Sequence, residues 1–489
     1  MNRFTRYFII IIAVVVITAL LIYSQTFTQG GQGADVGNSS AGQSQTSDEI
    51  DSSESTEDSN DISSDTSEED SSDVSSEDSS SSKDEHIHQA LERLIFDESY
   101  HWKECSCGEV LDKSAHEFEY VAQDNGAHAY VKKCVCGYQE ELQYTYLSQT
   151  QKLPLNAQVK DGQAAVNTEQ TVFVTLDKPS EKVVFVKYNG REIAYTHNEN
   201  IITLFASAFA FDYGEAELEL LTDNGYYGVC VLLITKQLQT KADLDSLNVL
   251  SKACEQDERK YGGYFTLANN IEYNGVWQGG IATRIDDQDA RSGQYGFCGV
   301  FDGCGYSISG MEQAGEYAYD GFIGVLCGGV IKNVKFASAS LLYSGGLVCA
   351  AGVGEIENVC VEYAQFGSEM DKGKAFGTFF GCWAGAGAVV KDCLIDCNSK
   401  QMPINRYGYL IGAIAYEDNV QDGVLQGVYV LVDQPMQNIV YEQSERTDIF
   451  GSYKNVAALK SDENAKAELL TWNEEYWLID DENIIFKAK

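Results

Sequence analysis

The sequence predicts a mainly β protein whose C-terminal half is a solenoid of short, stacked β segments. The 489 residues include 44 glycines and only four prolines, a composition that suits strands joined by many turns. Four stretches in the C-terminal half share one pattern: an aliphatic residue, any residue, a polar residue or Gly, and a small apolar residue. The third position recurs after 25, 34 and 35 residues, at Asn333, Asn358, Asp392 and Gly427. A unit of such length that recurs along a chain is typical of a solenoid.

The N-terminus is expected to anchor the chain in a membrane. Residues 8–22 form an apolar run that Arg3 and Arg6 precede, and no Lys or Arg follows it before Lys83. This asymmetry predicts a single-pass transmembrane signal anchor across residues 7–23, with a cytoplasmic N-terminus and the bulk of the chain extracellular. A cleaved signal peptide is the alternative, although no A-x-A site closely follows the run.

An acidic linker is expected over residues 24–85. Gln, Gly, Ser, Thr, Asp and Glu dominate this segment, which has too little apolar surface to offset the entropy lost on ordering. Residues 48–85 alone hold sixteen Asp and Glu against one Lys. The segment is therefore predicted to be disordered.

The formal net charge of the whole chain, −40, argues against binding to nucleic acid.

A small module rich in Cys and His is predicted over residues 86–145. It contains two Cys-x-Cys-Gly stretches about 27 residues apart, CSCG at 105–108 and CVCG at 134–137. Zinc prefers four nitrogen or sulfur ligands in a tetrahedron, and the glycines allow tight turns. Two disulfides are the alternative, because the predicted compartment is extracytoplasmic. The spacing predicts structural zinc on four thiolates, with His101 or His116 as alternates for one of them: Cys105, Cys107, Cys134 and Cys136.

The two Cys pairs resemble paired zinc knuckles. The stretch HWKECSCGEVLDKSAH is also similar to short Cys/His repeats of surface proteins from Gram-positive anaerobes. This resemblance implies a structural, zinc-ribbon-like module. Nothing marks an open coordination position with a general base beside it, so a catalytic zinc is not expected.

A β-sandwich is predicted over residues 150–238. The alternation in 215–220 indicates one buried face, and Asn189-Gly190 and Asn224-Gly225 are signals for tight turns. The arrangement resembles the Ig-like domains of bacterial surface proteins. Five segments rich in Val, Ile, Phe and Tyr are the strand candidates: 172–176, 182–188, 201–205, 215–221 and 226–235.

The solenoid is predicted over residues 240–489. Thr240 and Asp243 have the spacing of a capping box, and the leucines that follow at helical spacing indicate a short helix that caps the solenoid. The first solenoid strand is expected at 263–271. The aromatic residues after about 437 suit a C-terminal cap: Trp472, Tyr476, Trp477 and Phe486.

The solenoid carries the most specific resemblance. The stretch FxGxFDGxGYxIxG, followed by GFIGxLxGGxIKNV and GGLVxxxGxGxIENV, is similar to the GLUG-motif β-helices of bacterial cell-surface proteins over roughly 260–430. The resemblance implies a right-handed parallel β-helix. Asn333 and Asn358 are expected to form a hydrogen-bonded ladder, whereas Asp392 and Gly427 depart from the family pattern and leave the register of the later repeats open. Cys327, Cys349 and Cys382 are expected at similar positions within their repeats, where they would be interior thiols that act as small hydrophobic residues. A disulfide between neighbouring repeats is the alternative.

These features predict a membrane-anchored, non-enzymatic cell-surface protein that binds glycans or proteins through its β-helix and Ig-like domains. The alternative is a β-helix polysaccharide lyase or hydrolase tethered to the same membrane. Its candidate site is the loop 284–291, which holds three Asp and two Arg. A solvated loop with local ion pairs explains the same residues, and no catalytic residue is assigned.

Overall fold

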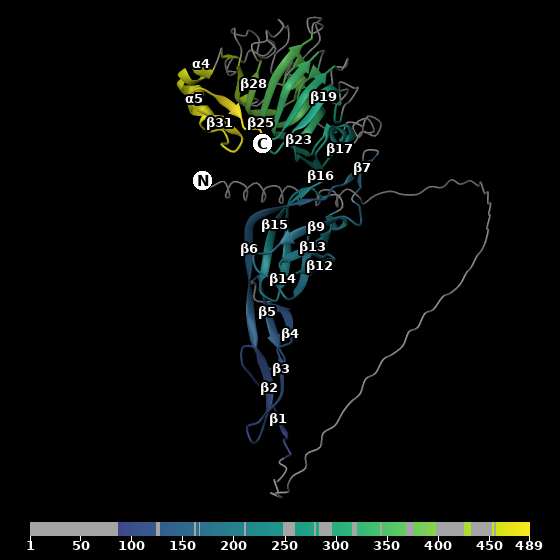
Figure 1. Ribbon diagram of the computed structural model, residues 1–489, viewed down its shortest axis with the longest axis vertical. Helices are drawn as coiled ribbons and strands as arrows, with labels where there is room; N and C mark the ends of the chain where they lie inside the picture. The colour runs from purple at the N-terminus through teal and green to yellow at the C-terminus, as the bar shows by residue number, and fades with distance from the viewer. Residues whose placement is uncertain are drawn as a thin grey trace, which may run out of the picture. The chain divides into compact units, whose positions relative to one another are not determined.

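The computed structural model describes residues 87–489 with gaps, and the described chain is mainly β (Figure 1). Among the described residues, no helix has the length and apolar character needed to cross a membrane. The expected anchor at 7–23 and linker at 24–85 lie outside the described residues. The gaps are 124–127, 161–162, 166, 210–211, 248–259, 278–279, 283–295, 315–319, 343–344, 368–375, 386, 398–424, 432–451 and 454–455.

The Cys/His region consists of two consecutive three-stranded antiparallel meanders. The first meander contains β1 (Ala90–Phe96), β2 (Tyr100–Cys105) and β3 (Val110–Ala115). The second contains β4 (Phe118–Ala122), β5 (Ala129–Cys134) and the beginning of β6 (Gln139–Pro154). In both meanders the Cys-x-Cys-Gly stretch forms the turn after the second strand.

The long strand β6 continues into a two-sheet domain, where its second half pairs in parallel with β15. One sheet of this domain continues β6 through β15 (Tyr226–Ile234), β14 (Gly214–Thr222), β10 (Val183–Tyr188) and β11 (Arg191–Glu192). The facing sheet contains β9 (Thr171–Thr175), β13 (Ile201–Phe205) and β12 (Tyr195–Asn198). A short hairpin, β7 (Gln158–Lys160) with β8 (Gln163–Ala165), precedes them, and a 3-10 helix, η1 (Ala206–Phe209), follows β13.

The two sheets enclose one apolar core. Alternate residues of facing strands contribute to it, among them Val174, Leu204, Leu218 and Val231, each 0% exposed. All five predicted strands are present with ends shifted by one residue at most, which confirms that the alternation in the sequence marks a buried face.

The two predicted turns differ in their backbone. Asn189 and Gly190 join paired Tyr188 and Arg191 with φ of 50° and 73°, the positive angles expected of an Asn-Gly hairpin. Asn224-Gly225 also forms a turn, but without positive φ. Here the hydroxyl oxygen of Thr222 accepts hydrogen bonds from both backbone N–H groups, 3.1 Å away in each case. The side chain thus provides the acceptor that stabilises the bend.

The C-terminal half is a stack of parallel strands, and every pairing described among them is parallel. Apolar residues fill its interior, including Trp277, Phe301, Phe322 and Phe336, all 0% exposed. The strands are β16 (Lys236–Leu238), β17 (Lys260–Tyr261), β18 (Tyr264–Leu267), β19 (Ile271–Trp277), β20 (Gly296–Phe297), β21 (Val300–Asp302), β22 (Ser307–Gln313), β23 (Ile323–Leu341), β24 (Gly345–Gly346), β25 (Cys349–Phe366), β26 (Phe376–Gly377), β27 (Phe380–Ala384), β28 (Val389–Asp396), β29 (Leu425–Leu431) and β30 (Ser452–Tyr453).

A helix at 241–247 packs against the first strands of the stack. Thr240 N–H donates to the Asp243 carboxylate at 3.0 Å, and Asp243 N–H donates to the Thr240 hydroxyl at 3.3 Å. This reciprocal pair is the predicted capping box. Leu244 and Leu247 are buried in the same core as Phe265, so the helix covers apolar surface at the beginning of the stack.

The third position of the repeated sequence pattern has the same backbone conformation in all four repeats. Asn333, Asn358, Asp392 and Gly427 all have positive φ, at 55°, 52°, 51° and 64°. Asn, Asp and Gly are the residues that tolerate this left-handed region. The neighbouring residues pair in matching register, so the four positions stack on one another. Asp392 and Gly427 therefore continue the register that the sequence left open.

Side chains at these positions form the expected ladder. Asn358 Nδ2 donates to Asn333 Oδ1 at 3.2 Å, and Asn333 Nδ2 donates to Asp302 Oδ1 at 2.9 Å. Asn333 and Asn358 are 6% and 4% exposed. The ladder pairs polar atoms that would otherwise be buried without partners. The expected equivalence of Cys327 and Cys349 is wrong, because Cys327 pairs with Val353 and Cys349 with Ile323.

The C-terminal segment packs against the side of the stack. It contains α4 (Val456–Ser461), α5 (Glu463–Leu469) and the hairpin of β31 (Trp477–Ile479) with β32 (Ile484–Phe486). Trp472, Trp477 and Phe486 share a core with residues of β25, β28 and β29. The Trp477 indole N–H donates to Asn358 Oδ1 at 3.2 Å. This segment therefore covers the ladder across several strands, not only at the last one.

Candidate metal centre

Four metal-ligating side chains meet at the boundary of the two meanders. They are His101, His116, Cys134 and Cys136, and their ligand atoms all lie within 4.8 Å of one another. His101 Nδ1 is 3.6 Å from Cys134 Sγ, and His116 Nδ1 is 3.5 Å from Cys136 Sγ. We call this group the second-meander cluster. Two thiolates and two imidazoles are a ligand set that zinc accepts in structural sites.

Hydrogen bonds hold both imidazole rings with Nδ1 toward the sulfurs. His116 Nε2 lies 2.9 Å from the carbonyl oxygen of Asp97, which can only accept, so Nε2 carries the proton and Nδ1 has a free lone pair. His101 Nε2 is 3.2 Å from Ser114 Oγ. A partner on the outer nitrogen orients a metal-binding histidine, and a pure acceptor such as the Asp97 carbonyl also fixes its tautomer. The Tyr138 ring also stacks on His116, with centroids 4.7 Å apart.

The turns that carry the cysteines have the same backbone in both meanders. Cys105 N–H donates to Glu109 O, and the Cys105 carbonyl oxygen accepts from Gly108 N–H; both distances are 2.8 Å. The equivalent bonds of Cys134 with Tyr138 and Gly137 are 2.9 Å and 3.0 Å. Gly108 and Gly137 have φ of 88° and 99°, which explains the glycine after each pair.

The electrostatics of the cluster favour a thiolate at Cys134. Burial opposes its ionisation, but hydrogen bonds from the Cys136 backbone N–H and, without metal, from the His116 ring in its doubly protonated form outweigh burial and lower the pKa of Cys134 to about 7. The thiolate is the form that binds metals. Burial and the neighbouring Cys134 sulfur raise the pKa of Cys136.

Cys105 and Cys107 lie in a separate group with His88. The three ligand atoms lie within 4.8 Å of one another, and His88 Nδ1 is 3.4 Å from Cys107 Sγ. We call this the first-meander cluster. Cys105 is buried, whereas Cys107 and His88 are exposed. None of the four cysteines in the two clusters forms a disulfide in the structure.

The four cysteines expected to share one site, Cys105, Cys107, Cys134 and Cys136, lie in two separate groups in the structure. The structure divides these thiols because each pair lies in the turn of its own meander. The alternates His101 and His116 were predicted to replace one cysteine, but both join Cys134 and Cys136. Sequence reasoning missed His88. The spacing could have found it, because His88 and His116 are 28 residues apart and Cys105 and Cys134 are 29 apart.

His128 joins neither cluster. Its ring stacks on Tyr144 with centroids 4.2 Å apart, and Nε2 lies 2.7 Å from the Tyr226 hydroxyl. Tyr226 in turn donates to Glu219 at 2.8 Å. His128 thus connects the second meander to the two-sheet domain.

The acidic loop 284–291 lies outside the described residues.

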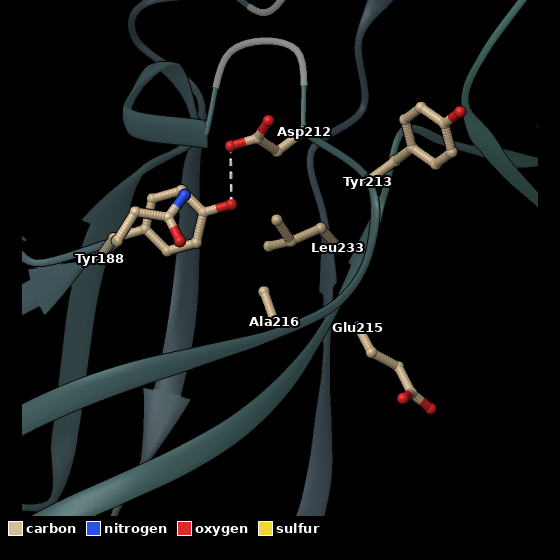
Figure 2. A pocket seen from close by; sticks show the side chains of 7 residues that line it. Tyr188, Asp212, Tyr213, Glu215, Ala216 and Leu233 are labelled. Carbon is tan, nitrogen blue, oxygen red and sulfur yellow. Dashed lines mark hydrogen bonds between the residues drawn. The ribbon is translucent and has the colours of Figure 1, made fainter. Parts of the chain in front are cut away.

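The two-sheet domain carries a hollow of about 350 Å³ (Figure 2). Across it, the Tyr188 hydroxyl donates to the Asp212 carboxylate at 2.7 Å. Figure 2 shows Ala216 and Leu233, which line the hollow, between the Tyr188–Asp212 pair and Glu215, whose side chain is directed away from that pair. Burial and the Asp212 carboxylate raise the pKa of Tyr188 to about 12, so the hydroxyl remains a donor at neutral pH.

Comparison with protein-family models, with curated proteins and with solved structures gave no match to this chain.

Proposed function

We propose that the second-meander cluster binds a structural zinc ion that joins the two meanders. The observation that carries this proposal is the convergence of four nitrogen and sulfur donors within 4.8 Å. Four protein ligands leave zinc no open position, which is the arrangement of structural sites. His101 comes from β2, His116 lies just before β4, and the cysteines lie at the end of β5 and in its turn. One ion would therefore connect three segments.

The second meander packs on the two-sheet domain through Tyr120, Tyr130 and Leu142, but little apolar burial holds the two meanders to each other. In the described residues between 87 and 138, the only buried apolar residues are Cys105, Ala129 and Cys134. Several large apolar side chains are exposed instead, including Leu91, Val121 and Val135 at 50%, 52% and 82%. Domains this small usually need metals or disulfides in place of a core. Metal binding would supply the folding free energy that apolar burial does not.

For the whole chain, we infer a non-enzymatic role at the cell surface, with a membrane anchor through residues 7–23. The parallel stack would form the right-handed β-helix that the GLUG-like motifs imply, and the two-sheet domain an Ig-like module. Stacking accounts for the repeated residues of the β-helix, because they fill its interior or form the ladder. Side-facing loops and the hollow at Tyr188 and Asp212 would then bind the glycans or surface proteins.

Metal analysis of the reduced, full-length chain tests the zinc proposal. We expect tightly bound zinc that His116→Ala and Cys136→Ser abolish, while Cys230→Ser, in the two-sheet domain, leaves it unchanged. In chain isolated without added reductant, absence of zinc together with absence of free thiols at Cys105, Cys107, Cys134 and Cys136 would support disulfides instead. A glycan and surface-protein binding screen tests the wider role, and depolymerisation of a polysaccharide by the purified chain would contradict it.

A further inference from the structure

We propose that His88, Cys105 and Cys107 form a second site for a zinc-class divalent cation, with three protein ligands and an open fourth position. The site shares no residue with the second-meander cluster. Two thiolates and an imidazole favour zinc over calcium or magnesium, which prefer oxygen ligands.

The first argument is the equivalence of the two meanders. His88 and His116 each lie two residues before the first strand of their meander, at Ala90 and Phe118. Cys105 and Cys134 each end the second strand, and the following turns share their hydrogen bonds. A histidine and two cysteines thus occupy the same places twice.

The second argument is the orientation of His88. Its Nδ1 lies 3.4 Å from Cys107 Sγ, and its Nε2 lies 2.8 Å from the Glu109 carboxylate. His116 has the same arrangement, with Nδ1 toward Cys136 and Nε2 toward the Asp97 carbonyl. A carboxylate on the outer nitrogen orients a ligating imidazole and makes it more basic. Both clusters therefore present Nδ1 to a thiol and protonated Nε2 to an oxygen acceptor.

The clusters differ in the fourth ligand. The second-meander cluster takes His101 from the meander before it. Among the described residues, no earlier meander supplies such a histidine to the first-meander cluster. His88 and Glu109 side chains are 38% and 56% exposed, so water or a ligand from solution can reach the ion. Three ligands and this exposure predict weaker, more exchangeable binding than at the second-meander cluster.

The number of zinc ions bound per chain, measured over a range of buffered free zinc concentrations, tests the proposal on the reduced, full-length chain. We expect two zinc ions per chain at saturation, taken up in a tighter and a weaker step. Cys107→Ser should abolish the weaker step alone, and His116→Ala the tighter step alone. Glu109→Gln, which keeps all ligands, should weaken the weaker step by roughly 10- to 100-fold. Cys230→Ser should change neither step.

Two results would overturn the second site. One is uptake of a single zinc ion by the wild-type chain at saturation. The other is loss of the tighter step in Cys107→Ser, since that would mean that both Cys pairs bind one ion. Because the clusters share no ligand, failure of the second-meander site would appear separately, as an unchanged profile in His116→Ala.

Discussion

The imidazole of His101 lies beside the thiol of Cys134, with Nδ1 3.6 Å from Sγ, although the two residues belong to different meanders. An ion held by both would fix one meander against the next. The proposed zinc would make the order of this module depend on metal more than on apolar burial, in contrast to the two-sheet domain and the parallel stack.

Chelation should loosen the meanders and leave the parallel stack intact. Zinc would supply most of the folding free energy of residues 87–138, where few side chains are buried. Limited proteolysis followed by mass spectrometry should show new cleavages in this segment after chelation, and zinc should reverse them. An identical cleavage pattern with and without chelator would argue against a metal-dependent module.

Ser114→Ala should weaken zinc binding at the second-meander cluster by roughly tenfold, because it removes the partner of the outer nitrogen of His101. Competition with a chromogenic chelator measures the change. Ser148→Ala, at an exposed position of β6, is the matched control. Equal affinities for the two variants would show that this hydrogen bond does not position His101.

Asn358→Ala should destabilise the parallel stack by about 2–4 kcal/mol. The substitution leaves the Trp477 indole and Asn333 amide without their partner and places alanine at a φ of 52°. Asn358→Gly removes the same hydrogen bonds but tolerates the backbone angle. Urea unfolding should therefore rank wild type above Asn358→Gly and Asn358→Gly above Asn358→Ala. If glycine restored full wild-type stability, the ladder would contribute nothing beyond backbone geometry.

Asp392→Asn should stabilise the chain at neutral pH and have little effect below about pH 4. Burial, reinforced by Glu357 and Glu468 against the opposing effect of Lys391, raises the pKa of Asp392 from 3.8 to about 6. The folded state disfavours the charged carboxylate, so stability falls as pH rises from about 4 to 6 and stays reduced above it. The shift corresponds to at most about 3 kcal/mol, and we expect about 1–2 kcal/mol.

Unfolding free energies of wild type and Asp392→Asn at pH 4 and pH 7 measure this effect. The asparagine is compatible with the backbone, since Asn333 and Asn358 occupy equivalent positions with nearly the same φ. A stability difference that does not change between the two pH values would mean that Asp392 does not titrate in this range.

Local patterns in the sequence predicted the strands well, because burial on one face imposes alternation directly. The strand at 201–205 and the capping box at Thr240 and Asp243 follow from such short-range rules. The ladder was also predictable, because Asn333 and Asn358 share both motif and spacing. Asp392 departs from the sequence pattern, yet it has the same positive φ as Asn333 and Asn358.

Contacts between repeats were harder to predict. Two Cys-x-Cys-Gly stretches are compatible with one shared ion or with two separate ones, and spacing alone does not distinguish them. Only the pairing of β2 with β3 and of β5 with β6 shows that each turn belongs to its own meander. The same limit applies to Cys327 and Cys349, whose partners depend on strand register.

The first coordination shell of zinc in the chain loaded with one equivalent tests the central claim most directly. X-ray absorption at the zinc edge should show two sulfur ligands at about 2.3 Å and two nitrogen ligands at about 2.0–2.1 Å. An unchanged shell in Cys107→Ser, together with loss of one nitrogen ligand in Cys136→Ser as the ion moves to His88, Cys105 and Cys107, would assign the ion to the second-meander cluster. Four sulfur ligands and no nitrogen would contradict the account and restore the single site on both Cys pairs.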